Sequence, residues 1–188
     1  MPIGLPPIVF EEADGSPSVR QPRKVILPAG SISHDGRNVT LSTVIAADVL
    51  RKSLTADVTN ATATMAGLTG LSVTLAAGAV YVGRLVLYCA DDVAADGFKC
   101  DFDGGSATMT NIRAHGVILD TALLLSTQVT ALATDFSVAV ITGNSRVDID
   151  IAMTVNAGGT FIPQFAQAAH TTGTATVYRG SYLYLVKI

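Results

Sequence analysis

The residue types that usually perform catalysis or bind metals are few in this chain and far apart. The three histidines, His34, His115 and His170, stand in three different stretches of the sequence. A zinc site needs ligands paired at short spacing, and no such pair occurs. The chain also has no phosphate-binding loop, no dinucleotide-binding glycine motif and no nucleophile elbow. The sequence therefore predicts a protein that is not an enzyme and that needs no cofactor or metal.

A group of aspartates is the strongest alternative to that interpretation. Asp91, Asp92 and Asp96 lie in one loop, and Asp101 and Asp103 follow shortly after. Calcium takes roughly six to eight oxygen ligands, so these carboxylates are candidates for a calcium site. Their spacing does not match an EF-hand, and aspartate before glycine is also typical of ordinary turns. We favour turns and leave calcium as the alternative.

The two cysteines flank the same acidic loop. If the loop is centred near residues 94–95, a hairpin would place Cys89 directly opposite Cys100, close enough for a disulfide. The first residues lack the basic start and the apolar core of a secretory signal, which predicts a protein kept in a reducing cytoplasm. We therefore favour two buried thiols over a disulfide.

The composition favours protein–protein contacts over other partners. Charged residues make up only 14% of the chain and hydrophobic residues 49%, with a formal net charge of −3. No apolar run approaches the roughly 18 residues of a membrane span, and no basic patch is available for nucleic acid. The excess of apolar residues predicts burial at an interface between copies of the chain, because obligate interfaces resemble a core cut in half.

Two strands are predicted to be apolar on both faces, and they indicate where that interface lies. Successive side chains of a strand point to opposite faces, yet residues 80–90 and 181–188 carry apolar residues in both alternations. Such strands must be covered on both sides. The candidate interface residues are Val80, Val82, Arg84, Val86, Tyr88, Tyr182 and Tyr184. Arg84 is the charge that we expect to need a partner there.

The fold class predicted is all-β, a jelly-roll-like β-sandwich preceded by an extended arm and a small β-meander. The sandwich occupies residues 55–188, where short apolar runs are separated by Gly, Asp or Asn. The strands are expected at residues 55–60, 71–75, 79–90, 97–102, 107–115, 136–141, 146–155, 160–166, 175–179 and 181–188. Residues 120–135 fit either a helix or a loop with strand pieces.

The first 54 residues are predicted to form an arm and a small module. Residues 1–22 are rich in proline, which fixes the backbone and lacks a donor, so they predict an extended docking arm. The apolar arm residues are Ile3, Leu5, Ile8, Val9 and Phe10. Residues 23–54 predict a β-meander with a turn at Asp35–Gly36. The meander would end in a short helix or connector over residues 44–53, where periodicity does not decide.

Two stretches resemble structural proteins of tailed bacteriophages. The order DGSPSV, KVIL, PAG, SIS, HDGRN and VTLS in residues 14–43 looks like a module that recurs in those proteins. Residues 158–188 look like the closing strands of their jelly-roll domains, with a TATV strand before the GSYLYLV ending. The HDGRN turn is shorter than the Gly/Asn-rich turn of the module. The resemblance implies a homotrimer with a second, C-terminal β-domain.

Together these observations predict a phage virion structural protein. The role we favour is a homotrimeric capsid decoration or cement protein that docks through its arm onto the major capsid protein or another virion protein. The alternative is a receptor-binding tip or short tail fibre that binds host surface glycan. The chain has no heptad or collagen repeats for a shaft, which favours decoration. Its expected location is the virion, assembled in the host cytoplasm.

Overall fold

The computed structural model describes residues 49–103, 105–120 and 122–188, together with four short strands nearer the N-terminus. The chain divides into two compact units, Met1–Ala46 and Ala47–Ile188. The side chains of Asp103 and Leu123 lie outside the description. Among the described residues, no helix is long and apolar enough to span a membrane.

The first unit contains two antiparallel strand pairs. β1 (Phe10–Glu11) pairs with β2 (Pro17–Val19), and β3 (Gly30–His34) pairs with β4 (Val39–Thr43). The second pair is the hairpin predicted around Asp35–Gly36. Four of the predicted arm residues, Ile3, Leu5, Ile8 and Val9, lie outside the described residues, and so does the strand expected at residues 24–27. Phe10 opens β1, so part of the expected extended arm is paired as a strand.

The second unit is an antiparallel β-sandwich, which confirms the predicted fold class. Its larger sheet has eight strands among the described residues. Four of them follow in the order β12 (Leu123–Val129), β11 (Thr108–Leu119), β14 (Ser145–Ala157) and β9 (Val80–Asp91). The far side of β9 is shared by β16 (Ala175–Val177) and β17 (Tyr182–Lys187), which pair onward with β6 (Val58–Asn60) and β5 (Val49–Ser53).

The smaller sheet closes the other side of the core. It runs β13 (Phe136–Val138), β10 (Phe98–Asp103), β15 (Gly159–Ala166), and its last edge is shared by β7 (Ala66–Gly67) and β8 (Val73–Leu75). Two short 3-10 turns, η2 (Thr69–Leu71) and η3 (Ala94–Asp96), lie in the connections. The chain crosses between the two sheets repeatedly, as in jelly-roll sandwiches.

Aromatic residues fill the core from the small sheet and aliphatic residues from the large one. The small sheet contributes five fully buried phenylalanines, Phe98, Phe102, Phe136, Phe161 and Phe165. Phe102 stacks on Phe161 with ring centroids 5.2 Å apart, and Phe98 stacks on Phe165 at 6.1 Å. The large sheet packs alternate aliphatic residues into the core, such as Leu85, Leu87, Val147 and Ile149, all 0% exposed. The strand expected at residues 146–155 is confirmed as part of β14, with alternate residues facing the core.

One close approach in the core explains a glycine. Gly116 on β11 faces the ring of Phe136, and a Cβ there would lie 2.3 Å from a ring carbon. The absence of a side chain lets the ring lie flat on the larger sheet.

The connection from β9 to β10 differs from the hairpin predicted around the acidic loop. The two strands belong to different sheets, because η3 and Gly97 carry the chain across the sandwich. Gly97 has φ 64°, and a Cβ on it would lie 2.3 Å from the carbonyl oxygen of Val138. Cys89 therefore pairs with Ser145 and Val177 in its own sheet, and the expectation that it lies opposite Cys100 in one ladder is wrong.

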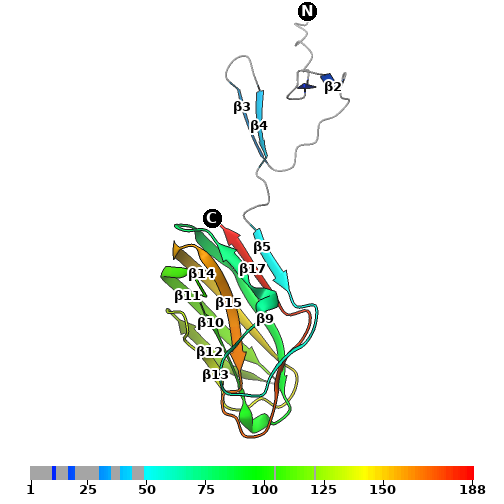
Figure 1. The fold of residues 1–188 in the computed structure, drawn as a ribbon, viewed down its shortest axis with the longest axis vertical. Helices are drawn as coiled ribbons and strands as arrows, with labels where there is room; N and C mark the ends of the chain where they lie inside the picture. The colour runs from blue at the N-terminus through cyan, green and yellow to red at the C-terminus, as the bar shows by residue number, and fades with distance from the viewer. Residues whose placement is uncertain are drawn as a thin grey trace, which may run out of the picture. The chain divides into compact units, whose positions relative to one another are not determined.

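Two segments left open by the sequence form strands. Residues 123–129 are β12, so the strand interpretation of residues 120–135 is confirmed there and the helix is wrong. Residues 49–53 are β5, paired with β17, where a helix or connector was predicted (Figure 1). The second unit consequently begins at Ala47, before the boundary expected near Leu54. The partner strand decides both cases, since periodicity alone does not distinguish short helices from strands.

Candidate functional site: the outer face of the large sheet

The strand register brings the predicted interface residues together on one surface. Val82, Arg84 and Val86 of β9 lie beside Val186, Tyr184 and Tyr182 of β17 in successive pairs. On the other side of β9 the same three residues lie beside Ala152, Asp150 and Asp148 of β14. Val80 and Tyr88 occupy the same alternation of β9. All seven candidate residues therefore share the face of the large sheet that points away from the core, which we call the outer face.

Exposure divides this set into three kinds. Tyr88 and Tyr184 are exposed, at 41% and 38%, and Val80, Val82 and Tyr182 are half-buried. Val86 is 0% exposed although it lies on the outer face, because Tyr182 and Asp148 flank it on the neighbouring strands. Val86 is thus part of the buried interior of a single chain and has no surface of its own to offer a partner.

Arg84 finds its partners within its own chain. Its Nε donates to Asp150 Oδ1 at 2.8 Å, and its Nη1 lies 3.9 Å from Asp148 Oδ1. The hydrogen bond and the charge of Asp150 raise the pKa of Arg84 further above its usual value. Arg146 Nη2 in turn lies 2.8 Å from Asp148 Oδ2. The two arginines and two aspartates form a balanced line of charge, so Arg84 does not need the partner across an interface that the sequence led us to expect.

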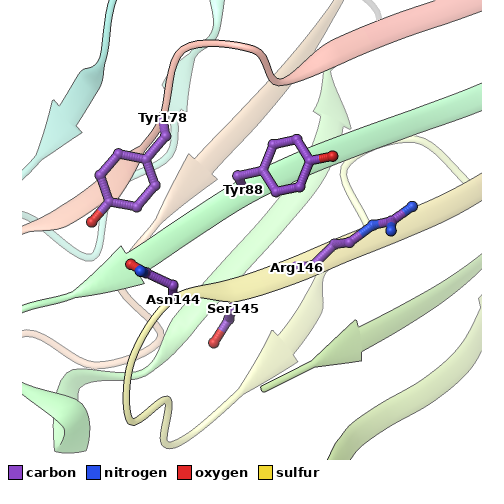
Figure 2. Close-up of a pocket in the computed structure, with 5 residues that line it drawn as sticks. All are labelled: Tyr88, Asn144, Ser145, Arg146 and Tyr178. Atoms are coloured by element: carbon purple, nitrogen blue, oxygen red, sulfur yellow. The ribbon is translucent and has the colours of Figure 1, made fainter. Parts of the chain in front are cut away.

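A shallow pocket lies at one end of the outer face. It has a volume of about 440 Å³ and is lined by Tyr88, Asn144, Ser145, Arg146 and Tyr178. Figure 2 shows the two tyrosine rings on one side of the sheet, while the hydroxyl of Ser145 points away from them. The Arg146 guanidinium lies 6.0 Å from the centroid of the Tyr88 ring. Aromatic rings, an arginine and an amide in one open hollow form a binding surface that combines flat apolar faces with polar edges.

The backbone around this pocket is held by a buried serine. Ser181, which is 0% exposed, accepts a hydrogen bond from Tyr88 N and donates one to Tyr178 O. Tyr178 N also donates to Tyr88 O at 2.8 Å. The turn that carries Asn144 is held by Asp120, which accepts hydrogen bonds from the backbone N–H and the hydroxyl of Thr142, two residues before Asn144. The backbone that carries the lining residues is therefore held in place before any ligand arrives.

The aspartates of the acidic loop make hydrogen bonds within the protein. Asp96, fully buried, accepts from the backbone N–H of Thr171 and of Gly173 and from the Thr171 hydroxyl. These bonds, led by that of Thr171, lower the pKa of Asp96 to about 2. Gln167 Nε2 donates to both Asp91 and Asp96. The network ties the crossover between the sheets to the loop before β16.

The other two aspartates with described side chains lie outside this network, and Asp101 lies on a strand where a turn was predicted. Asp92 accepts from the backbone N–H of Thr174. Asp101 lies on β10, away from the crossover loop and 4% exposed. Among the described residues, no three His, Cys, Asp or Glu side chains are grouped closely enough to hold a metal ion.

The cysteines are both free and buried. Burial raises the pKa of the Cys89 thiol to about 12 and raises that of Cys100 well above its usual value. Because the thiolate is the reactive form, both side chains remain protonated in the folded protein and act as core residues.

The histidines are not brought into any common site among the described side chains. His115 lies on the outer face, with Nε2 3.2 Å from the hydroxyl of Ser126. His170 lies in the loop before β16, with Nδ1 2.6 Å from Gln167 Oε1. His34 ends β3, and its side chain is outside the description.

Sequence reasoning identified Tyr88 but missed the rest of the pocket. Asn144 and Tyr178 lie in turns, and only the pairing of β14 and β16 with β9 brings them beside Tyr88. The buried network around Gln167 was also missed, because a glutamine in a polar loop gives no sign of being buried. The one available signal was Arg146, which the alternation of its strand places on the outer side.

Comparisons with known proteins give no family for this chain. No protein-family model and no curated protein matches it. Matches among solved structures include the Gt and Gx strains of infectious bursal disease virus, at 10% and 11% identity and TM-scores of 0.22 and 0.19. Each covers 85% of this chain and 45% or 41% of the viral chain. A mutant VP2 protein of the same virus, from derived T=1 particles, matches at 11% identity with a TM-score of 0.18.

The chain spans less than half the length of these viral chains. A likeness at such TM-scores carries no argument about function.

Proposed function

We propose that this chain is a structural protein of a bacteriophage particle and that copies of it assemble through the outer face of the large sheet. The observation that carries the proposal is the pairing of β9 with β17, the two strands that are apolar on both faces. Side by side, they place Val80, Val82, Tyr182 and Tyr184 in one area of the outer face. We call this area the self-association patch.

The charges around the patch are compatible with burial against a second copy. Arg84 is already paired with Asp150 and Asp148, and a buried pair costs far less than a buried single charge. Arg51 of β5 lies exposed beside Tyr184 on the same face and has no ion pair among the described residues, so the second copy would have to place a carboxylate or another acceptor against it. Tyrosine and arginine are also enriched at interfaces, where aspartate and lysine are depleted.

The finer proposal is a homotrimer that decorates or cements a capsid, docked through residues 1–22 onto the major capsid protein or another virion protein. It rests on the resemblance of residues 14–43 and 158–188 to phage structural proteins. A structural role rather than catalysis is part of the same proposal.

Light scattering on the full chain tests self-association. We expect a mass of three times the 19.4 kDa chain. Tyr184→Asp should reduce it to that of one chain, because the variant removes an aromatic ring from the patch and adds a carboxylate that must lose its water on burial even though Arg84 and Arg51 lie beside it. The matched control is Gln128→Asp, at an exposed position of the same face on the edge strand β12. A wild-type chain that runs as a monomer contradicts the proposal, and so does a Tyr184→Asp variant that stays oligomeric.

Sedimentation with phage capsids tests the docking role. The full chain should sediment with the capsids and a chain that lacks residues 1–22 should not. Equal binding by both would remove the arm from the proposal.

A receptor-binding tip or short tail fibre is the second candidate. The pocket beside Tyr88 favours it, because that hollow lies outside the self-association patch and is open to solvent.

A further inference from the structure

The pocket at the end of the outer face has the properties of a ligand site and lies outside the self-association patch, although Tyr88 was also among the predicted interface residues. Its residues come from β9, β14 and the turns that precede β14 and follow β16. Its volume of about 440 Å³ falls within the usual size of small-ligand pockets, roughly 300–1,000 Å³. We propose that this pocket binds a neutral saccharide, which deepens the receptor-binding alternative by naming its site and its ligand class.

The aromatic rings supply one half of saccharide recognition. A pyranose ring has a flat face of C–H groups and a rim of hydroxyls, so it packs against an aromatic face while its rim is hydrogen-bonded. The Tyr88 ring is 41% exposed, and Tyr178 stands half-buried beside it. Figure 2 shows both rings bordering the hollow. Exposed aromatic rings in a hollow are costly to hydrate and gain from an amphipathic ligand.

Uncommitted polar groups supply the other half. The phenol hydroxyls of Tyr88 and Tyr178 and the side-chain amide of Asn144 make no hydrogen bond to any other described residue. These groups include both donors and acceptors, which suits hydroxyl groups because each hydroxyl acts as both.

The charge of the pocket selects a neutral ligand over an anionic one. Arg146 is the one cation among the lining residues, and Asp148 already neutralises it at 2.8 Å. An incoming carboxylate or phosphate would have to compete with Asp148 for the same guanidinium. A neutral hydroxyl can accept from the remaining N–H groups without breaking that ion pair.

The backbone around the pocket is held in place, which favours binding by a small ligand. Ser181 holds the backbones of Tyr88 and Tyr178 through two hydrogen bonds, and Asp120 holds the turn before Asn144 through Thr142. A preformed backbone reduces the loop freedom that is lost when a ligand enters.

Saturation-transfer NMR on the full chain tests the inference, with maltose, cellobiose, lactose and an N-acetylglucosamine disaccharide as probes. At least one should bind, with an affinity on the order of millimolar, typical of a shallow site. Tyr88→Ala should weaken binding by about tenfold or more, and Asn144→Ala should weaken it less. Tyr88→Phe should retain the stacking part of the affinity. The matched control is Leu124→Ala, at an exposed apolar position of β12 outside both the pocket and the self-association patch, which should bind like the wild type.

Several results would overturn the inference: no binding by any of the four probes, or binding that Tyr88→Ala and Asn144→Ala leave unchanged. Tighter binding of sialyllactose than of lactose would overturn the neutral class. Circular dichroism of each variant excludes unfolding as the cause of a loss. Because oligomer mass is measured separately, a chain that is trimeric but binds no sugar fails only this inference, and a monomer that binds sugar fails only the assembly proposal.

Discussion

The two faces of the large sheet are built from the same kinds of residue and have different surroundings. On the inner face, Leu85 and Leu87 of β9 are fully buried against the phenylalanines of the small sheet. On the outer face, Val82 is half-buried and Tyr88 and Tyr184 are exposed. In the sequence, nevertheless, both alternations of β9 and of β17 consist mainly of apolar residues. The difference shows that alternation defines the two faces of a strand but does not state which of them the same chain covers.

Val86 sharpens this comparison because it is an outer-face residue with the burial of a core residue. Its neighbours across the strands, Asp148 and Tyr182, close over it. The loss of unfolding free energy on substitution by alanine should therefore depend on how deeply a side chain is buried and not on which face of the sheet it occupies. Two valines on the same face, Val82 and Val86, allow this to be tested against Leu85 on the other.

The largest effect is expected on the inner face. Leu85→Ala should lower the free energy of unfolding by about 2–5 kcal/mol, since it removes buried methyl groups and leaves a cavity. Val86→Ala should cost about 2 kcal/mol, and Val82→Ala about 1 kcal/mol or less. Urea unfolding of the three variants measures the order, in a background of Tyr184→Asp so that assembly does not contribute. If Val86→Ala is as mild as Val82→Ala, the outer face is looser around Val86 than its burial indicates.

Part of this arrangement was predictable from the sequence. Each of the ten expected strands overlaps an observed strand, because period-two alternation between turns marked by Gly and Asp is a local signal. The joining of β5 to β17, and the crossover of β9 to the other sheet at Gly97, are not local. Both features depend on pairing between strands that are far apart in the sequence, and neither composition nor local spacing predicts which strands pair.

The candidate sites divide in the same way. Tyr88 was predictable as an outer-face residue, whereas its neighbour Tyr178 comes from a turn whose position is set by the hydrogen bonds of Ser181. The buried position of Gln167, between Asp91 and Asp96, had no counterpart in the sequence pattern. Polar residues in loops are ordinarily exposed.

The second prediction compares this buried polar network with the exposed charges of the outer face. Hydrogen bonds from Thr171 and Gly173 hold the pKa of Asp96 at about 2 in the folded chain, against about 4 when unfolded. A carboxyl with a lowered folded pKa stabilises the fold above its unfolded pKa, and this stabilisation is lost as the pH falls through the folded value. Asp96→Asn should therefore be less stable than the wild type at pH 7, and the gap should narrow between about pH 4 and pH 2.

Urea midpoints at several pH values measure that gap. Asp92→Asn is the control, since Asp92 is exposed and accepts one backbone hydrogen bond from Thr174. A gap for Asp96→Asn that stays constant with pH would mean that its carboxylate charge is not what the network stabilises.

The smallest effect is expected for the outer-face ion pair. Arg84 and Asp150 have side chains 47% and 64% exposed, and exposed pairs are worth about 0–1 kcal/mol and weaken with salt. A double-mutant cycle with Arg84→Ala and Asp150→Ala, carried out in a monomeric Val80→Asp background that places no new charge directly beside Arg84, should give a coupling energy in that range. The same cycle in the wild-type chain should give a larger coupling if a second copy covers the pair, because the interaction strengthens when water is excluded. Equal coupling energies in both backgrounds would mean that no second copy covers the Arg84–Asp150 pair. The inner face of the sheet would then be covered by the small sheet and the outer face by water.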